Sequence, residues 1–143
     1  MVTTDPHDLQ RFVMAQDGIY EQALAELRAG RKASHWMWFV LPQLARLGSS
    51  SMAQRYAIGS LAEARAYLEH PVLGPRLVEC AEAVLTHPER TARQIMGTPD
   101  DAKLRSSMTL FAHATDAEPV FDQVLDAFFD GEQDPRTVEL LSA

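Results

Sequence analysis

The chain of 143 residues is 46% hydrophobic and 23% charged, with a formal net charge of −7. This length and composition suit one folded domain with its own core and exclude a disordered chain. The acidic balance argues against nucleic-acid binding, because neutralising phosphates requires a basic surface. The single cysteine, Cys80, excludes an intrachain disulfide and a zinc site of several thiolates, and it favours a reducing compartment.

Neither a secretory signal nor a membrane span is expected. The first eight residues contain no basic region and no apolar region of the kind that a signal peptide has. No apolar run reaches the roughly 18 to 20 residues that a spanning helix needs. We therefore expect a cytoplasmic protein with no membrane partner.

Helical patterns begin near the N-terminus. The pair Asp5-Pro6 is typical of an N-cap followed by the first residue of a helix. Apolar side chains then recur at helical spacing as far as Leu27, on both sides of Gly18, which is expected to bend or break the helix. Gly30 is expected to end it.

The middle of the chain predicts two further helices. Ser60 and Glu63 have the spacing of a capping box, and the helix that they open is expected to run to about Glu69. Pro75 is expected to open the next helix. Cys80 falls on the apolar face of that helix, which favours a buried packing role over a nucleophilic one.

Four more helices are expected in the last third. They are a short one over 91–96 that ends at Gly97, one over 100–113 capped by Thr98 and Pro99, one over 120–129, and one opened by Asp134-Pro135. No segment alternates as a half-buried strand does. The sequence thus predicts an all-α fold, in which residues 1–143 form a single compact orthogonal domain of roughly seven or eight short helices.

The most unusual stretch is 31–44, which holds both tryptophans and a histidine. In a structural interpretation, Trp36, Phe39 and Val40 anchor a short helix in the core. In a functional interpretation, His35 and Trp38 line a pocket.

The same functional interpretation makes Arg31 or Lys32 an anchor for an anion. Both interpretations of the stretch remain open at this point.

A second unusual stretch runs from Asp100 to His113. On a helix, Arg105, Thr109 and His113 share a face, opposite a face of apolar side chains. That polar face is either exposed to solvent or part of a binding surface. The binding alternative includes the neighbouring cation and hydroxyls, which are Lys103, Ser106 and Ser107.

A third, weaker candidate is the serine-rich turn 48–51. Free N–H groups and hydroxyls at such a turn suit an anion, but a helix N-cap formed by Ser51 is the simpler interpretation. The sequence contains none of the common nucleotide, hydrolase or metalloprotease motifs, and its five histidines have no metal-ligand spacing. We therefore expect no cofactor and no metal, and the pair Asp100-Asp101 favours helix capping over acid–base catalysis.

Distinctive blocks extend over nearly the whole chain. The strongest are His35-Trp36-Met37-Trp38-Phe39 and Lys103–Phe111, and others are 5–12, 27–32, 42–44, 47–50, 53–56 and 73–77. In these blocks the chain resembles a family of small bacterial proteins of unknown function, which also occurs in mycobacteria and related actinobacteria. Its members are sometimes labelled calpastatin, a label that does not fit a chain with the composition of a folded core. The resemblance implies a compact helical domain and supplies no reaction, cofactor or catalytic residue.

Two functional hypotheses follow. In the first, the domain binds, and in an enzymatic version acts on, an anionic, nucleotide-like small molecule. His35 would then be the candidate for proton transfer. The pocket in this hypothesis consists of cations, hydroxyls and aromatic groups, which are Arg31, Lys32, His35, Trp38, Lys103, Arg105, Ser106 and Ser107.

In the second hypothesis the chain is a helical protein–protein interaction module without catalytic activity. From Asp116 to the end there are eight acidic residues and one basic residue, Arg136. This acidic third would meet a basic partner protein, which the sequence does not identify, or keep the chain soluble.

Overall fold

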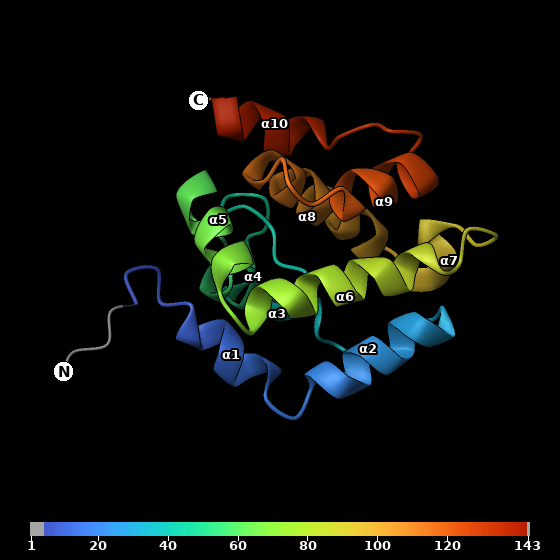
Figure 1. Ribbon diagram of the computed structural model, residues 1–143, viewed down its shortest axis with the longest axis horizontal. Coiled ribbons are helices and arrows are strands. Elements are labelled where there is room, and N and C mark those ends of the chain that lie inside the picture. Colours follow the sequence, from blue (N-terminus) through green and yellow to red (C-terminus); the bar gives the residue numbers. More distant parts are fainter. Residues whose placement is uncertain (1–4, 143) are drawn as a thin grey trace.

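The computed structural model describes residues 5–142, and within them the chain forms ten helices (Figure 1). The helices are α1 (Gln10–Gln16), α2 (Tyr20–Ala29), α3 (Met37–Val40), α4 (Ser51–Arg55), α5 (Leu61–Glu69), α6 (Leu73–Leu85), α7 (Ala92–Met96), α8 (Asp100–Ala114), α9 (Val120–Phe129) and α10 (Pro135–Ser142). No strand lies in this range, and a single parallel β-bridge joins Leu44 to Ile58. The prediction of an all-helical single domain is confirmed, and α3, α4 and α7 are the shortest elements.

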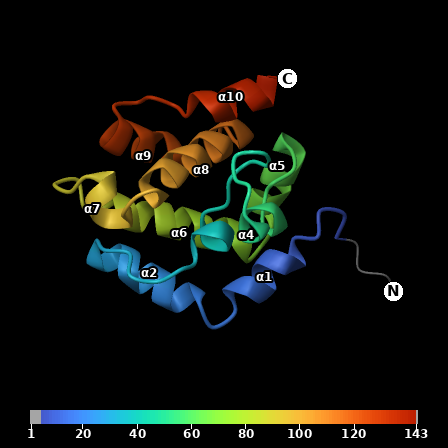
Figure 2. The same cartoon turned by 180° about the vertical axis from the view of Figure 1, so that it is seen from behind.

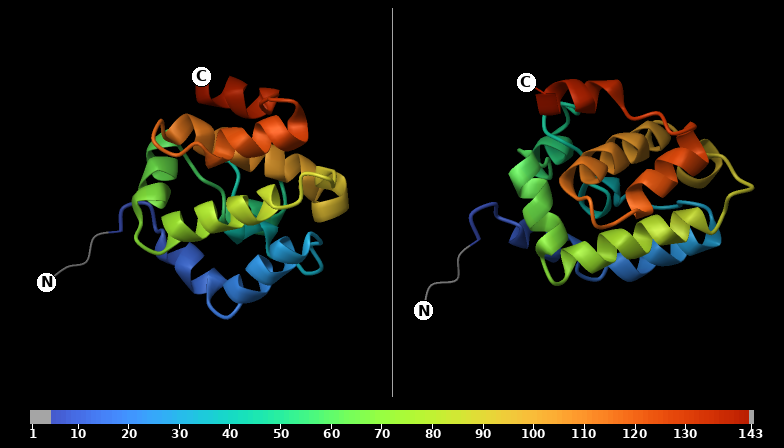
Figure 3. Two further views of the ribbon diagram at one scale, coloured as in Figure 1. Left: turned by 45° about the vertical axis from the view of Figure 1, so that its right-hand side comes forward. Right: turned by 45° about the horizontal axis from the view of Figure 1, so that its top comes forward.

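Helix α8 lies at the centre of the fold and packs against α5, α7, α9 and α10 (Figure 3). Its side chains are buried on nearly all sides, including the polar residues Ser106, Ser107 and Thr109. The Ser106 hydroxyl donates to the Ala102 carbonyl at 3.2 Å, and the Thr109 hydroxyl donates to the Arg105 carbonyl at 2.8 Å. Small side chains that bond to their own helix allow the neighbouring helices to approach closely.

Helix α6 is the second long element and packs against α2, α5 and α9. Figure 1 shows α2 and α6 side by side. Cys80 is fully buried on α6, as predicted, and burial raises the pKa of its thiol to about 12. A thiol with such a pKa is almost entirely protonated at neutral pH, which agrees with a packing role.

Gly74 sets the distance between α5 and α6. A Cβ atom at this position would lie 2.1 Å from the Leu68 carbonyl oxygen, at the end of α5. Only glycine therefore allows the two helices to meet this closely at the turn between them.

Several predicted helix ends are confirmed. The Ser60 hydroxyl accepts from the Glu63 N–H at 3.1 Å, and α5 ends at Glu69, but the Glu63 carboxylate accepts from the Gly59 N–H, so only half of the predicted capping box forms. A complete capping box joins Thr91 and Gln94 at the start of α7. Gly30 ends α2 in the left-handed conformation, with φ of 78°.

Three predicted helix starts are wrong. The first helix begins at Gln10 rather than Pro6, because Asp8 has a φ of 50°, which is not a helical conformation. The Asp5 carboxylate still accepts from the Leu9 and Gln10 N–H groups. The N-cap of α4 is Ser50 rather than Ser51, with the Ser50 hydroxyl accepting from Ala53.

Helix α6 begins at Leu73 rather than Pro75. The His70 Nδ1 atom accepts from the Val72 and Leu73 N–H groups and so caps the chain earlier. Pro75 is accommodated in the first turn, where its missing N–H group leaves no helical bond unmade.

The stretch that holds both tryptophans is anchored in the core, as one interpretation predicts. Trp36, Phe39 and Val40 are buried, and Trp36 is completely so. The Glu26 carboxylate of α2 accepts from Trp36 Nε1 at 2.9 Å and from the Ala33 and Ser34 N–H groups. Within residues 5–142, no helix combines the length and the apolar character that crossing a membrane requires.

Candidate functional site

Two of the predicted ligand-binding residues, Lys103 and Ser106, face the same depression in the surface beside α8. This depression, which we call the α8 hollow, has a volume of about 480 Å³. Its other walls come from the segment before and within α4 and from the start of α10. Its polar lining consists of Gln43, Ser49, Ser50, Lys103, Ser106, Asp134 and Arg136.

The α8 wall of the hollow carries a positive charge. The Lys103 ammonium lies 3.6 Å from the nearer oxygen of Asp100 and 5.7 Å from the centre of the Trp38 ring. The other Asp100 oxygen lies 2.8 Å from Lys32 Nζ. Because two lysines share one carboxylate, this wall keeps a net positive charge on a protein that is acidic overall.

The α10 wall contains one cation and one carboxylate. The Asp134 carboxylate is engaged as a helix cap, because it accepts from the N–H and the hydroxyl of Thr137 at 2.9 and 2.6 Å. Arg136 lies 3.2 Å from Glu139, but both side chains are largely exposed, and an exposed ion pair of this kind is weak enough for a ligand to compete with it. Sequence reasoning missed Arg136, although it is the one basic residue of the acidic last third.

A second, smaller cavity adjoins the hollow, and we call it the aromatic pocket. Its volume is about 140 Å³, and its polar and aromatic walls are Trp38, Gln43, Arg46, Gln54 and Tyr56. Gln43, Gly48 and Ala53 line both cavities.

Gly48 is required at this boundary. A Cβ atom on it would lie 2.6 Å from the Ala53 Cβ atom, so glycine lets the chain pass close over α4. Figure 2 shows the segment that holds α4 on the face turned toward the viewer.

The remaining predicted residues of the 31–38 stretch lie apart from the hollow. Arg31 and His35 are exposed and line neither cavity. Lys32 is buried and its ammonium is held by Asp100 and by the Ser34 carbonyl at 2.7 Å. Trp38 faces the aromatic pocket and is thus the residue of this stretch that the structure brings to Lys103.

The predicted polar face of α8 holds the connection between α9 and α10. Arg105 donates to the Glu132 and Gln133 carbonyls, each at 2.9 Å, and the His113 ring lies 2.9 Å from the Gln133 side-chain oxygen. Between them, the Thr109 hydroxyl accepts from the Asp134 N–H at 2.9 Å. This face is therefore covered by protein, and Arg105 lines neither cavity.

Ser107 is completely buried on α8. Its hydroxyl finds no hydrogen-bond partner among residues 5–142. It lines neither cavity, so the structure separates it from its neighbour Ser106.

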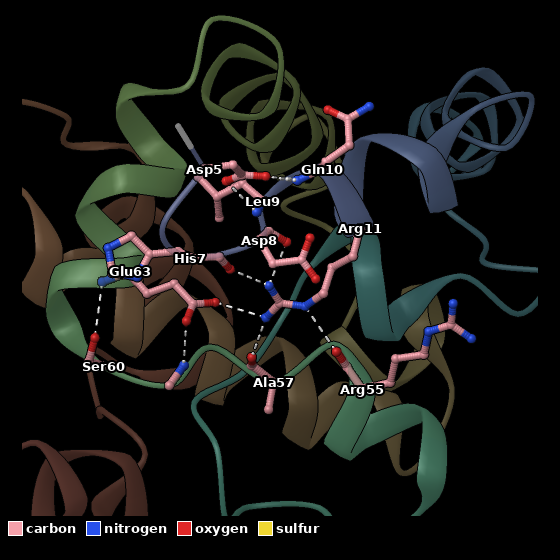
Figure 4. Close-up of polar contacts among 11 residues, drawn as sticks. Asp5, His7, Asp8, Leu9, Gln10, Arg11, Arg55, Ala57, Ser60 and Glu63 are labelled. Carbon is pink, nitrogen blue, oxygen red and sulfur yellow. Dashed lines mark hydrogen bonds and ion pairs between the residues drawn. The ribbon is translucent and has the colours of Figure 1, made fainter. Parts of the chain in front are cut away.

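A polar cluster that sequence reasoning did not single out surrounds Arg11 (Figure 4). Its guanidinium donates to the Glu63 carboxylate at 2.9 Å and to the carbonyls of Arg55 and Ala57 at 3.0 and 2.8 Å. It also donates to the carbonyls of His7 and Asp8. The cluster joins the N-terminal segment to the back of the aromatic pocket, and its polar groups satisfy one another.

No candidate metal site is present in the part of the chain that the structure describes. No group of three or more histidine, cysteine, aspartate or glutamate side chains gathers within residues 5–142 as metal ligands do. The two cavities together present three cationic side chains, hydroxyls, amides and two aromatic rings.

Comparison with known proteins gives a family and a close structural relative. The chain matches the family described as "Protein of unknown function (DUF1810)" over residues 6–141. It is similar to the crystal structure of the conserved hypothetical protein Rv1873 from Mycobacterium tuberculosis, with 56% identity and a TM-score of 0.96, over 97% of this chain and 99% of that one. No curated protein matches the chain. The chain therefore belongs to the DUF1810 family of unknown function.

Proposed function

We propose that this protein binds a small anionic molecule in the α8 hollow. The observation that carries the proposal is the placement of Lys103 and Ser106 on one wall and of Ser49 and Arg136 on the others. Ammonium, guanidinium and hydroxyl groups around one concavity are the usual partners of phosphates and carboxylates.

The charges of the hollow support this ligand class. Among the described residues, Asp134 is the one carboxylate in its lining, and one of its oxygens accepts the helix-cap bonds from Thr137. The lining thus contains two cations, Lys103 and Arg136, and one carboxylate. An anion would also gain from the amide of Gln43 and the hydroxyl of Ser49.

A test uses inorganic phosphate as the probe. Isothermal titration calorimetry should detect phosphate binding to the wild type. Replacing either cation, as Lys103→Met or Arg136→Met, should weaken it by about tenfold or more, the loss of one charge-assisted contact. Arg65→Met is the matched control, because Arg65 is exposed on α5 and lines neither cavity.

Two outcomes of the phosphate titration would contradict the proposal. Phosphate binding that is absent in the wild type, or equal in all three variants, excludes the α8 hollow as an anion site. Circular dichroism of each variant shows whether a lost signal reflects binding or folding.

The second candidate function is a helical interaction module without catalytic activity, and one groove favours it. Leu68, Pro75 and Val78 form apolar walls beside the carboxylates of Glu69 and Glu118, in a volume of about 450 Å³. This lining suits a segment that carries apolar and basic side chains. An immobilised basic, apolar peptide should be retained by the wild-type protein and not by the double variant Glu69→Lys/Glu118→Lys, and equal retention by the two proteins would exclude the groove.

A further inference from the structure

We infer that the anionic ligand carries one flat six-membered heteroaromatic ring, as a pyrimidine nucleotide does, and that this ring lies in the aromatic pocket. The inference rests on the proposed anion site and adds a second subsite to it. It assigns the class of ligand that the two adjoining cavities would take together.

The size of the aromatic pocket suits one ring. Its volume of about 140 Å³ is close to the roughly 150 Å³ of an apolar cavity that accepts benzene. Trp38 and Tyr56 stand among its walls, and aromatic faces stack on planar rings. A fused two-ring base would need more room than this cavity supplies.

The pocket also presents polar groups that the protein leaves free. Among residues 5–142, no hydrogen bond uses the Trp38 Nε1 atom, the Gln43 side-chain amide or the Tyr56 hydroxyl, although all three side chains are buried or half-buried. The Gln54 amide donates to the Ser49 carbonyl at 3.1 Å, which leaves its oxygen free to accept. Two amides, each able to donate and accept, match the edge of a pyrimidine better than that of a plain hydrocarbon ring.

Arg46 adds a cation at the mouth of the same pocket. It lies in the left-handed region with φ of 75°, which a residue other than glycine adopts at a cost in free energy. Its guanidinium forms no ion pair among the described residues. Arg46 is exposed, so its guanidinium is available to the electron-rich edge of a ring bound in the pocket.

The two subsites are close enough for one molecule. Lys103 Nζ, on the wall of the α8 hollow, lies 5.7 Å from the centre of the Trp38 ring in the aromatic pocket. Gln43 and Gly48 belong to both cavities. A phosphate beside Lys103 and a ring beside Trp38 would therefore be joined by a short link such as a pentose.

The aromatic pocket is rigid before any ligand arrives. The Tyr56 ring packs against Phe39 and Phe12, with centres 5.3 and 5.9 Å apart. Arg11 fixes the backbone on both sides of Tyr56 through the carbonyls of Arg55 and Ala57 (Figure 4). A preformed wall lowers the entropic cost of binding, so the ring should add directly to the affinity of the phosphate.

The experiment compares four probes by calorimetry on the wild-type protein: inorganic phosphate, UMP, CMP and AMP. We expect UMP or CMP to bind at least tenfold more tightly than phosphate, and more tightly than AMP. Trp38→Leu should reduce nucleotide affinity to that of phosphate while leaving phosphate affinity unchanged. Lys103→Met should weaken both.

The possible contrary outcomes distinguish the ring subsite from the anion site. Phosphate binding with nucleotides no tighter would overturn the ring subsite and leave the anion site intact. AMP binding as tightly as UMP would overturn the single-ring assignment. UMP binding that is unchanged in Lys103→Met, without phosphate binding, would overturn the anion site and retain the aromatic pocket. Should Trp38→Leu fail to fold, Gln54→Leu provides the same test of the ring edge.

Discussion

Lys32 Nζ lies 2.8 Å from Asp100 Oδ2, so that an ion pair ties the loop after α2 to the first residue of α8. The Lys32 side chain is only 7% exposed, and its ammonium also lies 5.0 Å from the centre of the Trp36 ring. A buried cation of this kind must keep its partners, because an unpaired charge in the interior is costly. The lysine therefore serves first to join three segments of the fold.

Removal of that cation should destabilise the protein. Lys32→Met is expected to lower the free energy of unfolding by about 2 kcal/mol, because Asp100 would keep only the more distant Lys103. Urea denaturation measures the change. Lys103→Met is the control and should cost less than about 1 kcal/mol, since that pair is longer and more exposed. Equal losses in the two variants would contradict this account.

Glu26 should make stability depend on pH in the acidic range. Burial alone would raise the pKa of its carboxyl, but hydrogen bonds from the Ser34 hydroxyl, the Ala33 N–H and the Trp36 indole outweigh that effect and lower the pKa to about 2. Because the folded-state pKa is depressed, the stabilisation is complete above the ordinary value of 4.5 and is lost as the pH falls toward 2.

The variant Glu26→Gln isolates this contribution. The difference in unfolding free energy between wild type and variant should shrink by roughly 2 kcal/mol between about pH 6 and about pH 3. Urea denaturation at the two pH values measures it. A difference that stays constant with pH would show that the Glu26 carboxylate is not stabilised by the fold.

Arg11 should be the costliest surface-accessible side chain to remove. Arg11→Ala leaves the partly buried Glu63 carboxylate without its cation and frees several backbone carbonyls, so we expect a loss of about 3 kcal/mol. Arg11→Lys keeps the charge but lacks the planar fork and should recover only part of the loss. Arg65→Ala, on the exposed side of α5, should change the unfolding free energy by less than about 0.5 kcal/mol.

Arg105 should hold α10 in place, and with it the Arg136 wall of the α8 hollow. Its bonds to the Glu132 and Gln133 carbonyls tie the α9–α10 connection to α8. Arg105→Ala is expected to raise amide hydrogen exchange in α10 while exchange in α6 stays unchanged. Phosphate affinity should fall no further than it does in Arg136→Met, because Arg105 acts on the ligand only through the position of α10. A tenfold loss of affinity with normal exchange would instead place Arg105 at the ligand.

Ser107 offers a substitution that should not destabilise the fold. Its buried hydroxyl has no partner among the described residues, and an unsatisfied buried hydroxyl opposes folding. Ser107→Ala should therefore leave stability unchanged or raise it by up to about 1 kcal/mol, as thermal denaturation would show. A clear loss of stability would mean that the hydroxyl has an unseen partner such as a bound water.

Much of the helical fold could be predicted because its determinants are local. The caps at Ser60 and Thr91 and the stop at Gly30 each depend on residues within one helical turn. The start of α6 depends on the way the His70 ring turns toward the chain, which residue patterns do not reveal. The start of α1 depends on the backbone of Asp8, a residue of ordinary type with an uncommon conformation.

The candidate site was harder to predict, because it depends on contacts between distant segments. Periodicity placed Arg105, Thr109 and His113 correctly on one face but could not show that the residues before α10 cover it. Gln43 and Tyr56 come from a segment without strong periodicity. Gln43 and Tyr56 lie close together because the neighbouring residues Leu44 and Ile58 form a β-bridge, and no local sequence pattern indicates that contact.

The Leu44–Ile58 bridge closes the segment that contains α4 into one loop on the helical bundle. Leu44 and Ile58 are both buried, and the bridge between them brings together the two ends of the loop that contains α4. Between these anchored ends, the segment can change length at a small cost in loop entropy while the surrounding helices keep their packing. In such an architecture, substitutions at exposed positions within residues 45–57 should reshape the shared boundary of the two cavities without unfolding the bundle.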